Sequence, residues 1–362
     1  MIKTTIITIL LFMLCCLTVS EAKTFKIATY NVQNLFDLTH DGTEYPEYIP
    51  NTHFGWTRDM VDIKITNIAM VIKDLKADII SLQEVESKKS LVCLTNRLKT
   101  FNVNYPYFEI ADDSKTVTIK CAVLSKYPII KKEEIKIKNK LNRNILKVTL
   151  DIEGNRLVLF INHWKSKKGP ESYRIDYAKA LKKAIDKLKN DEDFVLIGDF
   201  NSNYNEYKTF VNNKKLNNTN DITGINHILR TITSSKIVNE KILTIQPDNE
   251  YLYNLWLEVN MKRRWSYNFF GNKSSPDNII LSKGLYNDKG ISYIDNSFDK
   301  FDPDYLFNRN AIYRWQRTKK GKGRHTGAGY SDHLPIFAIF STEPFRKDPT
   351  PVIKKKSKFD FY

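Results

Sequence analysis

Polar residues with acid, base or ligand chemistry stand at the ends of several short apolar runs of this chain. The set is Asn31, Glu84, His163, Asp199, Asn201, Asp277, Asp332 and His333. A turn or a helix cap would explain any one of these residues alone. It would not explain why every member of the set is Asn, Asp, Glu or His. Strand ends converge on a cleft in mixed α/β folds, so we expect these side chains to meet in space.

Three members of the set carry the oxygen atoms that a hard divalent cation prefers. Glu84 and Asp332 supply carboxylates, and Asn31 supplies an amide oxygen. Mg²⁺ binds through one or two carboxylates plus substrate phosphate, so Mg²⁺ or Mn²⁺ is the expected ion, and Ca²⁺ is a third candidate. The chain has no Cys/His spacing typical of a structural zinc site.

The remaining members suit general acid–base catalysis. His163 and His333 titrate near neutral pH, and Asp199 with Asn201 could hold a water and a phosphoryl oxygen. A metal ion, an oriented water and donors aimed at developing charge make a site for phosphoester hydrolysis. The sequence lacks the GxSxG, GxxxxGK[ST] and HExxH patterns, so serine hydrolases, P-loop NTPases and zinc proteases have no support.

Apolar periodicity predicts the elements that must position these side chains. Spacings of four, three, four and three predict helices over residues 61–75 and 174–188, and leucines predict another over 91–98. Strands are predicted over residues 25–30, 78–82, 122–124, 145–152, 157–161, 194–197, 278–281 and 335–340. Strands and helices interleave, and a hairpin turn stands at residues 153–155, so we expect an α/β fold with mixed sheets.

Residues 1–22 have the pattern of a secretory signal peptide. A positive start precedes a mostly apolar centre, and Ser20 and Ala22 place small residues at the −3 and −1 positions of a cleavage site. An uncleaved anchor helix is the alternative, although the apolar run is short for a bilayer span of about 20 residues. We therefore expect an exported protein, periplasmic or secreted, with one catalytic domain over residues 23–342 and a basic tail over 343–362.

The composition is that of a folded, basic protein. Apolar residues make up 41 %, which excludes wholesale disorder. Lys and Arg number 57 against 41 Asp and Glu, a formal charge of +16, which favours polyanionic partners unless lysine-rich codon usage explains it. The basic run at residues 314–324 leads directly into Asp332. Cys93 and Cys121 are expected as buried thiols, although a disulfide between them stays open.

The stretches that carry the polar set follow one another in a characteristic order. They lie at residues 28–34, 78–86, 122–129, 162–167, 198–201, 277–282 and 331–335. This order resembles the endonuclease/exonuclease/phosphatase superfamily, the deoxyribonuclease I-like fold, and in particular an exported bacterial member. The resemblance spans nearly the whole chain after residue 22. It implies a four-layer α/β sandwich, in which two mixed β-sheets pack face to face and are flanked by helices.

The resemblance also implies a role for each residue on the metal and water side of the site. Glu84 would be the main metal ligand, helped by Asn31 and Asp332. Asp199 would orient or deprotonate the attacking water, and Asn201 would contact the scissile phosphate.

The same resemblance assigns the two histidines to the phosphate and the leaving group. His333, oriented by Asp277, would contact the phosphate or serve as an acid or base. His163 would donate the proton to the leaving oxygen.

Three basic residues are expected on the substrate side. Arg174 matches a recurrent Arg of bacterial members, as a substrate contact or as a structural residue. Lys165 extends a basic edge beside His163. Lys120 stands where members often have an Arg, and a point charge does not replace the bidentate contact of a guanidinium. Substrate positioning on that side is the one departure from the family pattern.

These expectations favour an exported, metal-dependent nuclease whose substrate is DNA rather than RNA. The alternative is a phosphatase or phosphodiesterase that acts on phospholipid headgroups or inositol phosphates with the same site, and an apolar membrane-inserting hairpin would favour it. A non-catalytic binding protein on the same scaffold is a third hypothesis, which the complete set of core positions disfavours.

Overall fold

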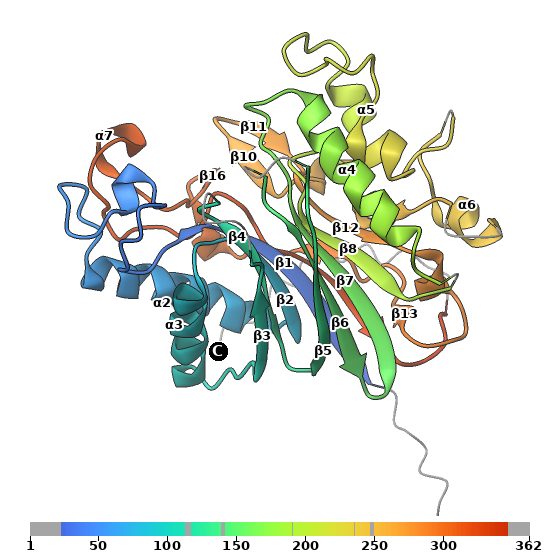
Figure 1. Cartoon of the computed structure of the whole chain (residues 1–362), viewed down its shortest axis with the longest axis horizontal. Coiled ribbons are helices and arrows are strands. Elements are labelled where there is room, and N and C mark those ends of the chain that lie inside the picture. The colour runs from blue at the N-terminus through green and yellow to red at the C-terminus, as the bar shows by residue number, and fades with distance from the viewer. Residues whose placement is uncertain are drawn as a thin grey trace, which may run out of the picture.

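The computed structural model describes residues 23–112, 117–138, 142–189, 191–234, 236–246 and 250–346. The predicted signal peptide, residues 1–22, lies outside the described residues, as does the predicted basic tail from residue 347 onward. Two mixed β-sheets pack face to face and helices flank their outer faces, which confirms the predicted α/β sandwich (Figure 1).

The first sheet contains the strands that hold Asn31 and Glu84. Its order is β13-β17-β1-β2-β4-β3, and β14 also pairs with β17. Its strands are β1 (Thr24–Leu35), β2 (Ile79–Val85), β3 (Tyr107–Ile110), β4 (Lys120–Ser125), β13 (Ser292–Tyr293), β14 (Asp299–Lys300) and β17 (Ile336–Ser341). β1 and β2 run parallel, and the other neighbours are antiparallel. β1 continues past its predicted end, and this extension carries Asn31.

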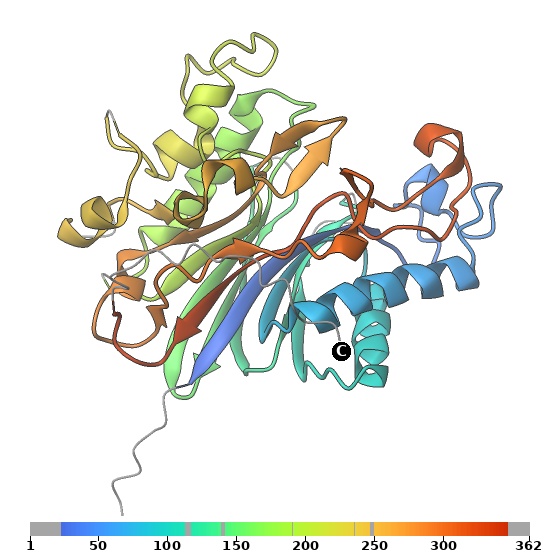
Figure 2. The ribbon, with the colours of Figure 1, turned by 180° about the vertical axis from the view of Figure 1, so that it is seen from behind.

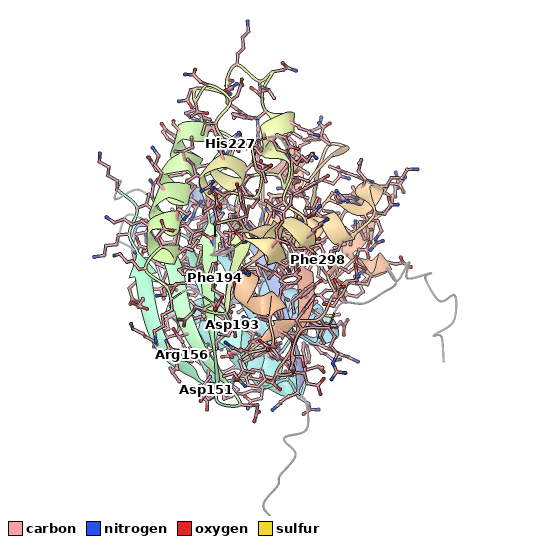
Figure 3. The ribbon with its side chains drawn as sticks, turned by 90° about the vertical axis from the view of Figure 1, so that its right-hand side faces the viewer. Asp151, Arg156, Asp193, Phe194, His227 and Phe298 are labelled. Atoms are coloured by element: carbon pink, nitrogen blue, oxygen red, sulfur yellow. The ribbon has the colours of Figure 1, made fainter. Side chains whose placement is uncertain are left out.

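The second sheet has the order β5-β6-β7-β8-β12-β9. Its strands are β5 (Ile129–Ile135), β6 (Ile145–Ile152), β7 (Asn155–His163), β8 (Phe194–Asp199), β9 (Tyr253–Asn254) and β12 (Asp277–Leu281). β7 and β8 are its parallel pair. Glu153 and Gly154, both at positive φ, form the predicted tight turn between β6 and β7. Asp151 and Arg156 pair beside this turn at the lower rim, opposite the end where His227 lies (Figure 3).

Alternating side chains on each strand build one core between the sheets and another under the helices. Ile27 and Ile79 pack against the second sheet, whereas their neighbours Ala28 and Ile80 pack with the helices outside the first sheet. These helices are α2 (Arg58–Leu75) and α3 (Lys88–Thr100), and α4 (Glu171–Ile185) covers the second sheet (Figures 1 and 2). The periodicity therefore located all three long helices.

Several short elements were not predicted. β3 and β5 are missing from the predicted strands, and residues 283–329, over which no element was predicted, contain several short ones. Two hairpins matter below: β10 (Tyr267–Phe269) with β11 (Asn272–Ser274), and β15 (Phe307–Asn308) with β16 (Ala311–Ile312). Short helices are α5 (Glu206–Thr209), α6 (Glu240–Ile245), α7 (Thr318–Gly321) and the π-helical turn Gly224–Ile228. The 3₁₀ turns are Pro46–Tyr48, Leu255–Glu258, Met261–Arg263, Lys283–Tyr286 and Asp304–Leu306.

A further sequence expectation concerns the two cysteines, which were predicted to be buried thiols. Cys93 and Cys121 are not joined by a disulfide; Cys121 is buried between the sheets and Cys93 is partly buried beneath the helices. Among the described residues, no helix combines the length and apolarity that crossing a bilayer requires.

Gly198 allows β7 and β8 to approach directly beneath the site. Its φ is +127°, and a Cβ built there would lie 2.2 Å from the carbonyl oxygen of Asn162. Such a contact cannot be relieved by a side-chain rotation, because the obstructing atom belongs to the backbone of β7. Asp199 follows immediately, so the glycine also fixes where that carboxylate stands.

We predict that Gly198→Ala strongly destabilises the protein, because the added methyl group forces the two strands apart. Gly154→Ala is the matched control: it also has a positive φ, +86°, but its added Cβ would meet no atom within 4 Å. Urea unfolding should show a loss of about 1 kcal/mol for the control, from backbone strain alone, and a much larger loss for Gly198→Ala. Equal losses for the two variants would contradict the steric argument.

Candidate active site

The ends of five strands and the segment that leads into β17 bring the polar set together at one rim of the sandwich. His163, Asp199 and Asp277 form a single row across the second sheet, because the register pairs His163 with Asp199 and Asp199 with Asp277. Asn31 of the first sheet and His333, in the segment before β17, face this row. The structure thus places residues from β1, β2, β7, β8, β12 and the segment before β17 around one site.

The expected metal ligands lie on the side of the first sheet. Asn31 Nδ2 donates to Glu84 Oε1 at 3.2 Å and to Asp199 Oδ2 at 3.1 Å. Burial raises the pKa of Glu84, and the Asp332 carboxylate raises it further. A carboxylate whose charge is disfavoured by burial and by a second carboxylate is one that a divalent cation stabilises, so Glu84, with Asp332 beside it, fits such an ion. Arg314, whose Nη2 is 3.7 Å from Asp332 Oδ2, neutralises only part of this charge.

Backbone strain aims Glu84 into the site. Its φ is +67°, and Gln33 and Asn34, opposite it on β1, also have positive φ values. The pairing of β1 with β2 shifts register here, which is a β-bulge. The N–H of Asn34 donates to Glu84 Oε2 at 3.0 Å, so the irregular backbone holds the carboxylate that it reorients. Non-glycine residues at positive φ cost free energy and concentrate at functional sites.

Asp199 is the buried carboxylate at the centre of the site. Its Oδ1 accepts the N–H of Asn201 at 2.8 Å. Burial raises the pKa of Asp199 to about 6, although the positive charge of His333 opposes the rise. The carboxylate is therefore ionised at neutral pH, yet basic enough to take a proton from water. Asn201 has a φ of +48° and donates from Nδ2 to the carbonyl oxygen of Trp164 at 3.0 Å.

His333 and Asp277 form a buried hydrogen-bonded pair. His333 Nδ1 lies 2.8 Å from Asp277 Oδ2, which also accepts the hydroxyl of Ser266 at 2.5 Å. Burial alone would lower the pKa of His333, but the Asp277 carboxylate outweighs it and the pKa rises to about 10. The imidazole is thus a cation at neutral pH. Its Nε2 lies 4.0 Å from Asp199 Oδ2, beyond direct hydrogen-bond distance.

His163 is in the site but has the opposite electrostatic character. Its Nε2 lies 3.7 Å from Asp199 Oδ2 and 3.8 Å from Glu84 Oε1. Burial lowers the pKa of His163 well below 6.5, and the positive charge of Arg143 lowers it further. A neutral imidazole can donate a hydrogen bond, but it is a poor proton donor to a leaving oxygen. The electrostatics therefore favour His333 for that expected role.

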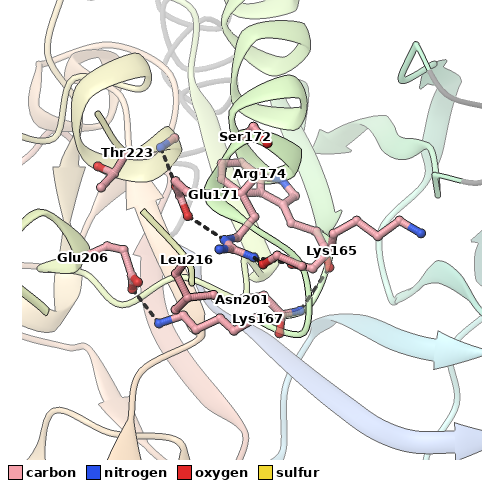
Figure 4. A network of polar contacts seen from close by, with 12 residues as sticks. Lys165, Lys167, Glu171, Ser172, Arg174, Asn201, Glu206, Leu216 and Thr223 are labelled. Atoms are coloured by element: carbon pink, nitrogen blue, oxygen red, sulfur yellow. Dashed lines mark hydrogen bonds and ion pairs between the residues drawn. The ribbon is translucent and has the colours of Figure 1, made fainter. Parts of the chain in front are cut away.

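Arg174 is a positioning residue in this structure. It is fully buried, donates from Nε to Glu171 at 2.7 Å, and donates from Nη1 to the carbonyl oxygens of Lys165, Ser166 and Gly169 (Figure 4). These bonds hold the loop after β7, whose Trp164 carbonyl anchors Asn201. Of the two readings of Arg174 from sequence, the geometry favours the structural one.

Lys165 and Lys120, the other two expected substrate contacts, lie at the edges of the site. Lys165 is half-buried, and burial together with Arg143 lowers its pKa. Lys120 begins β4 and donates from Nζ to the carbonyl oxygen of Glu86 at 2.5 Å. This bond ties the ammonium to the end of β2, two residues past Glu84.

Arg143 is a residue of the site that the sequence patterns did not indicate. It precedes β6 and donates from Nε to the carbonyl oxygen of His163 at 3.0 Å and from Nη2 to that of Trp164 at 2.9 Å. Its charge acts on Glu84 as well as on His163. No motif surrounds it, so only the spatial neighbourhood of β7 reveals it.

The fold and the site together define a phosphoester hydrolase. The chain belongs to the endonuclease/exonuclease/phosphatase family, whose model matches residues 26–238 and 233–342. Enzymes of this family use divalent metals. Besides the Glu84 and Asp332 pair, the ligand atoms of Asp199, Asp277 and His333 lie within 4.8 Å of one another. In that second group, His333 Nδ1 and Asp277 Oδ2 are already hydrogen-bonded to each other.

Solved structures of the same fold cover most of the chain at low sequence identity. ANGEL2, a 2′,3′-cyclic phosphatase solved in complex with adenosine-2′,3′-vanadate, is 16 % identical, with a TM-score of 0.54 over 90 % of this chain and 97 % of its own. D. rerio TDP2 with a single-strand DNA product is 13 % identical, with a TM-score of 0.52 over 88 % and 99 %. A Bacteroides thetaiotaomicron family protein is 14 % identical, with a TM-score of 0.51 over 89 % and 99 %. A search of curated proteins by sequence gives no match.

We predict that Asp277→Asn moves the alkaline limb of the pH–activity profile to lower pH. The carboxylate is the main group that raises the pKa of His333 to about 10, so its loss lets the imidazole lose its proton at lower pH. The pH dependence of kcat/KM measures this shift. Asp193→Asn, a buried carboxyl that accepts the N–H of Ile291, is the control and should leave the profile unchanged. An unshifted alkaline limb in Asp277→Asn would contradict a cationic His333.

Proposed function

We propose that the protein is an exported, metal-dependent nuclease that cleaves phosphodiester bonds of nucleic acid, DNA in preference to RNA, by attack of an activated water. The observation that carries the proposal is the arrangement of three groups. A basic carboxylate, Asp199, faces a cationic imidazole, His333, across 4.0 Å, and the Glu84 carboxylate is joined to Asp199 through Asn31.

Asp199 and His333 divide the proton transfers of the reaction between them. Asp199 accepts a proton from the water whose oxygen forms the new bond to phosphorus. His333 is the protonated group that faces it, so it stabilises the charge on the phosphoryl oxygens and supplies a proton as the bond to the leaving oxygen breaks. Asp277 keeps the imidazole charged and fixes the ring so that Nε2 faces the substrate.

Glu84 and Asp332 are the residues that would hold the metal, and Asn31, expected as a third ligand, instead donates from Nδ2 to the Glu84 carboxylate. When bound there, a divalent cation would polarise the phosphoryl group and offset the charge of the two carboxylates. Mg²⁺ is the ion that this donor set suits best, Mn²⁺ would be accepted, and Ca²⁺ is the third candidate.

The surroundings of the site support a polyanionic substrate. Arg143 and Lys165 lie on one side, and Arg314 lies beside Asp332 on the other. The formal charge of +16 adds a long-range attraction to nucleic acid, which would weaken steeply with salt. D. rerio TDP2, a structural neighbour, is complexed with a single-strand DNA product, which agrees with a nucleic-acid substrate.

A phosphatase or phosphodiesterase acting on phospholipid headgroups or inositol phosphates is the second candidate. The observation that favours it is the pair Phe269 and Phe270, 47 % and 90 % exposed at the tip of a hairpin beside the site. ANGEL2, another structural neighbour, is a phosphatase, so the fold accommodates that chemistry as well. A substrate panel of DNA, RNA, phospholipid and inositol phosphate separates the two candidates.

We predict that Asp199→Asn and removal of metal each abolish cleavage of a DNA oligonucleotide. The substitution keeps the shape of the side chain but removes its basicity, so the rate should fall by at least about 100-fold. A chelator should have a comparable effect that added Mg²⁺ or Mn²⁺ reverses. Glu153→Gln, a change to an exposed carboxylate at the opposite rim, is the control. Full activity in Asp199→Asn would sink the assignment of the base.

Export is tested separately. If residues 1–22 are a cleaved signal peptide, the N-terminal sequence of the protein recovered outside the cytoplasm begins at Lys23. Recovery of the intact N-terminus in the membrane fraction would support the anchor helix instead.

A further inference from the structure

A row of aromatic rings leads from the catalytic imidazole out to solvent. The ring centroids of His333 and Tyr267 lie 4.8 Å apart. Those of Tyr267 and Phe269, two residues along the same strand, lie 6.3 Å apart with the planes 9° from parallel. Phe270 follows, 4.6 Å from Phe269 and edge-on to it. We call Tyr267, Phe269 and Phe270 the aromatic row.

Among the described residues, no packing role accounts for the outer rings of the aromatic row, which stand in solvent. Phe269 is 47 % exposed and Phe270 is 90 % exposed, whereas Phe side chains are among those most often buried. Their neighbours in the hairpin, Asn268, Asn272 and Lys273, are polar, so the hairpin itself carries no wider apolar face. Exposed aromatic residues held in a defined place are typical of recognition surfaces.

The hairpin that carries the aromatic row is joined firmly to the active site. Tyr267 forms a backbone bridge with His333, and Leu334 donates its N–H to the carbonyl of Ser266 at 2.8 Å. The Ser266 hydroxyl donates to Asp277, the partner of His333. The aromatic row is therefore held at a fixed distance from His333, where the phosphate of a bound strand would lie. Figures 1 and 2 show the β10–β11 hairpin standing above this rim of the sandwich.

Positive charge lies on the hairpin that packs against β10. The β15–β16 hairpin packs against β10, and Trp265 at the base of one hairpin makes an edge contact with Phe307 of the other. Arg309 and Arg314 line a shallow pocket on this second hairpin, and Arg314 reaches toward Asp332. Aromatic faces beside guanidinium groups are the two features that a single strand requires, one for its bases and one for its phosphates.

We propose that the aromatic row is a stacking platform for the unpaired bases of a single-stranded nucleic acid, with Arg309 and Arg314 binding the adjacent phosphates. The proposal rests on the proposed function, because it places a nucleic-acid backbone at His333. It makes the enzyme selective for single strands and unpaired ends, since a paired base keeps its faces covered by its neighbours in the duplex.

The geometry favours bases over a lipid surface. A membrane contact needs only the outermost ring, and it gains from a wide apolar face that this hairpin lacks. In the aromatic row, by contrast, the rings continue inward from Phe270 through half-exposed Phe269 to Tyr267 at the imidazole. Such a graded row follows the path of a chain that enters the site.

A binding experiment tests the proposal without relying on catalysis. In the Asp199→Asn background, fluorescence anisotropy compares an oligothymidylate with an abasic oligomer of the same length in Mg²⁺. The parent should bind the oligothymidylate at least about tenfold more tightly. Phe269→Ala/Phe270→Ala should lose this preference, and Phe269→Trp/Phe270→Trp should keep it. Ile245→Ala, which removes an exposed apolar side chain from α6, is the matched control. If the alanine variant kept the parent's preference for the oligothymidylate over the abasic oligomer, the proposal would be overturned.

Kinetics then separate this inference from the proposed function. In the otherwise unaltered protein, Phe269→Ala/Phe270→Ala should raise KM for a single-stranded oligonucleotide about tenfold. It should leave kcat and the hydrolysis of bis(p-nitrophenyl) phosphate unchanged. If the unaltered protein hydrolyses neither substrate, the proposed function fails, and the anisotropy result still decides whether the row binds bases. Loss of co-sedimentation with phosphatidylglycerol vesicles in the alanine variant, with oligonucleotide binding unchanged, would assign the row to a lipid surface and overturn the proposal.

Discussion

The site depends on contacts that cross from one sheet to the other. Asp277 belongs to the second sheet and His333 to the segment that enters the first, and the hydrogen bond between them joins the two. The bond from Asn31 to Asp199 is a second such crossing. Neither sheet alone holds a complete set of groups. The apolar core between the sheets is therefore what sets the distances of the chemistry, because its packing fixes how close the two rims come.

The same burial gives two histidines of one site opposite charges. His333 and His163 are both buried, and burial lowers the pKa of each imidazole. His333 has a carboxylate at hydrogen-bond distance, which reverses the effect, whereas His163 lies among longer contacts and near Arg143. Two histidines that look equivalent in the sequence thus become a cation and a neutral donor. The difference arises from which partner each ring reaches.

The sequence predicted the strands that hold the catalytic residues because their signals are strong and local. Asp199 follows a continuous apolar run and Asn31 a mostly apolar one, and the spacing of residues 61–75 is that of one helix face. β5 was missed because its central residues, Lys131 to Glu134, are charged, as an edge strand allows.

What could not be predicted depends on distant contacts. Arg143 becomes part of the site only because its guanidinium reaches the carbonyls that end β7. The burial of Arg174 is decided by Glu171 and the loop that follows His163, and a sequence motif cannot separate that role from a substrate contact. Likewise, the three-residue strands of the β10–β11 hairpin are too short for periodicity to reveal.

Chemistry and recognition occupy different parts of the chain for a topological reason. The long strands β1, β2, β7 and β8 supply groups that act on any phosphoester, and their rigidity keeps those groups in place. The two hairpins belong to the connections that lead into β12 and β17, so they emerge beside Asp277 and His333 whatever their sequence. A change of residues at Phe269 or Arg309 can therefore alter which substrate approaches while the buried row from His163 to Asp277 stays as it is.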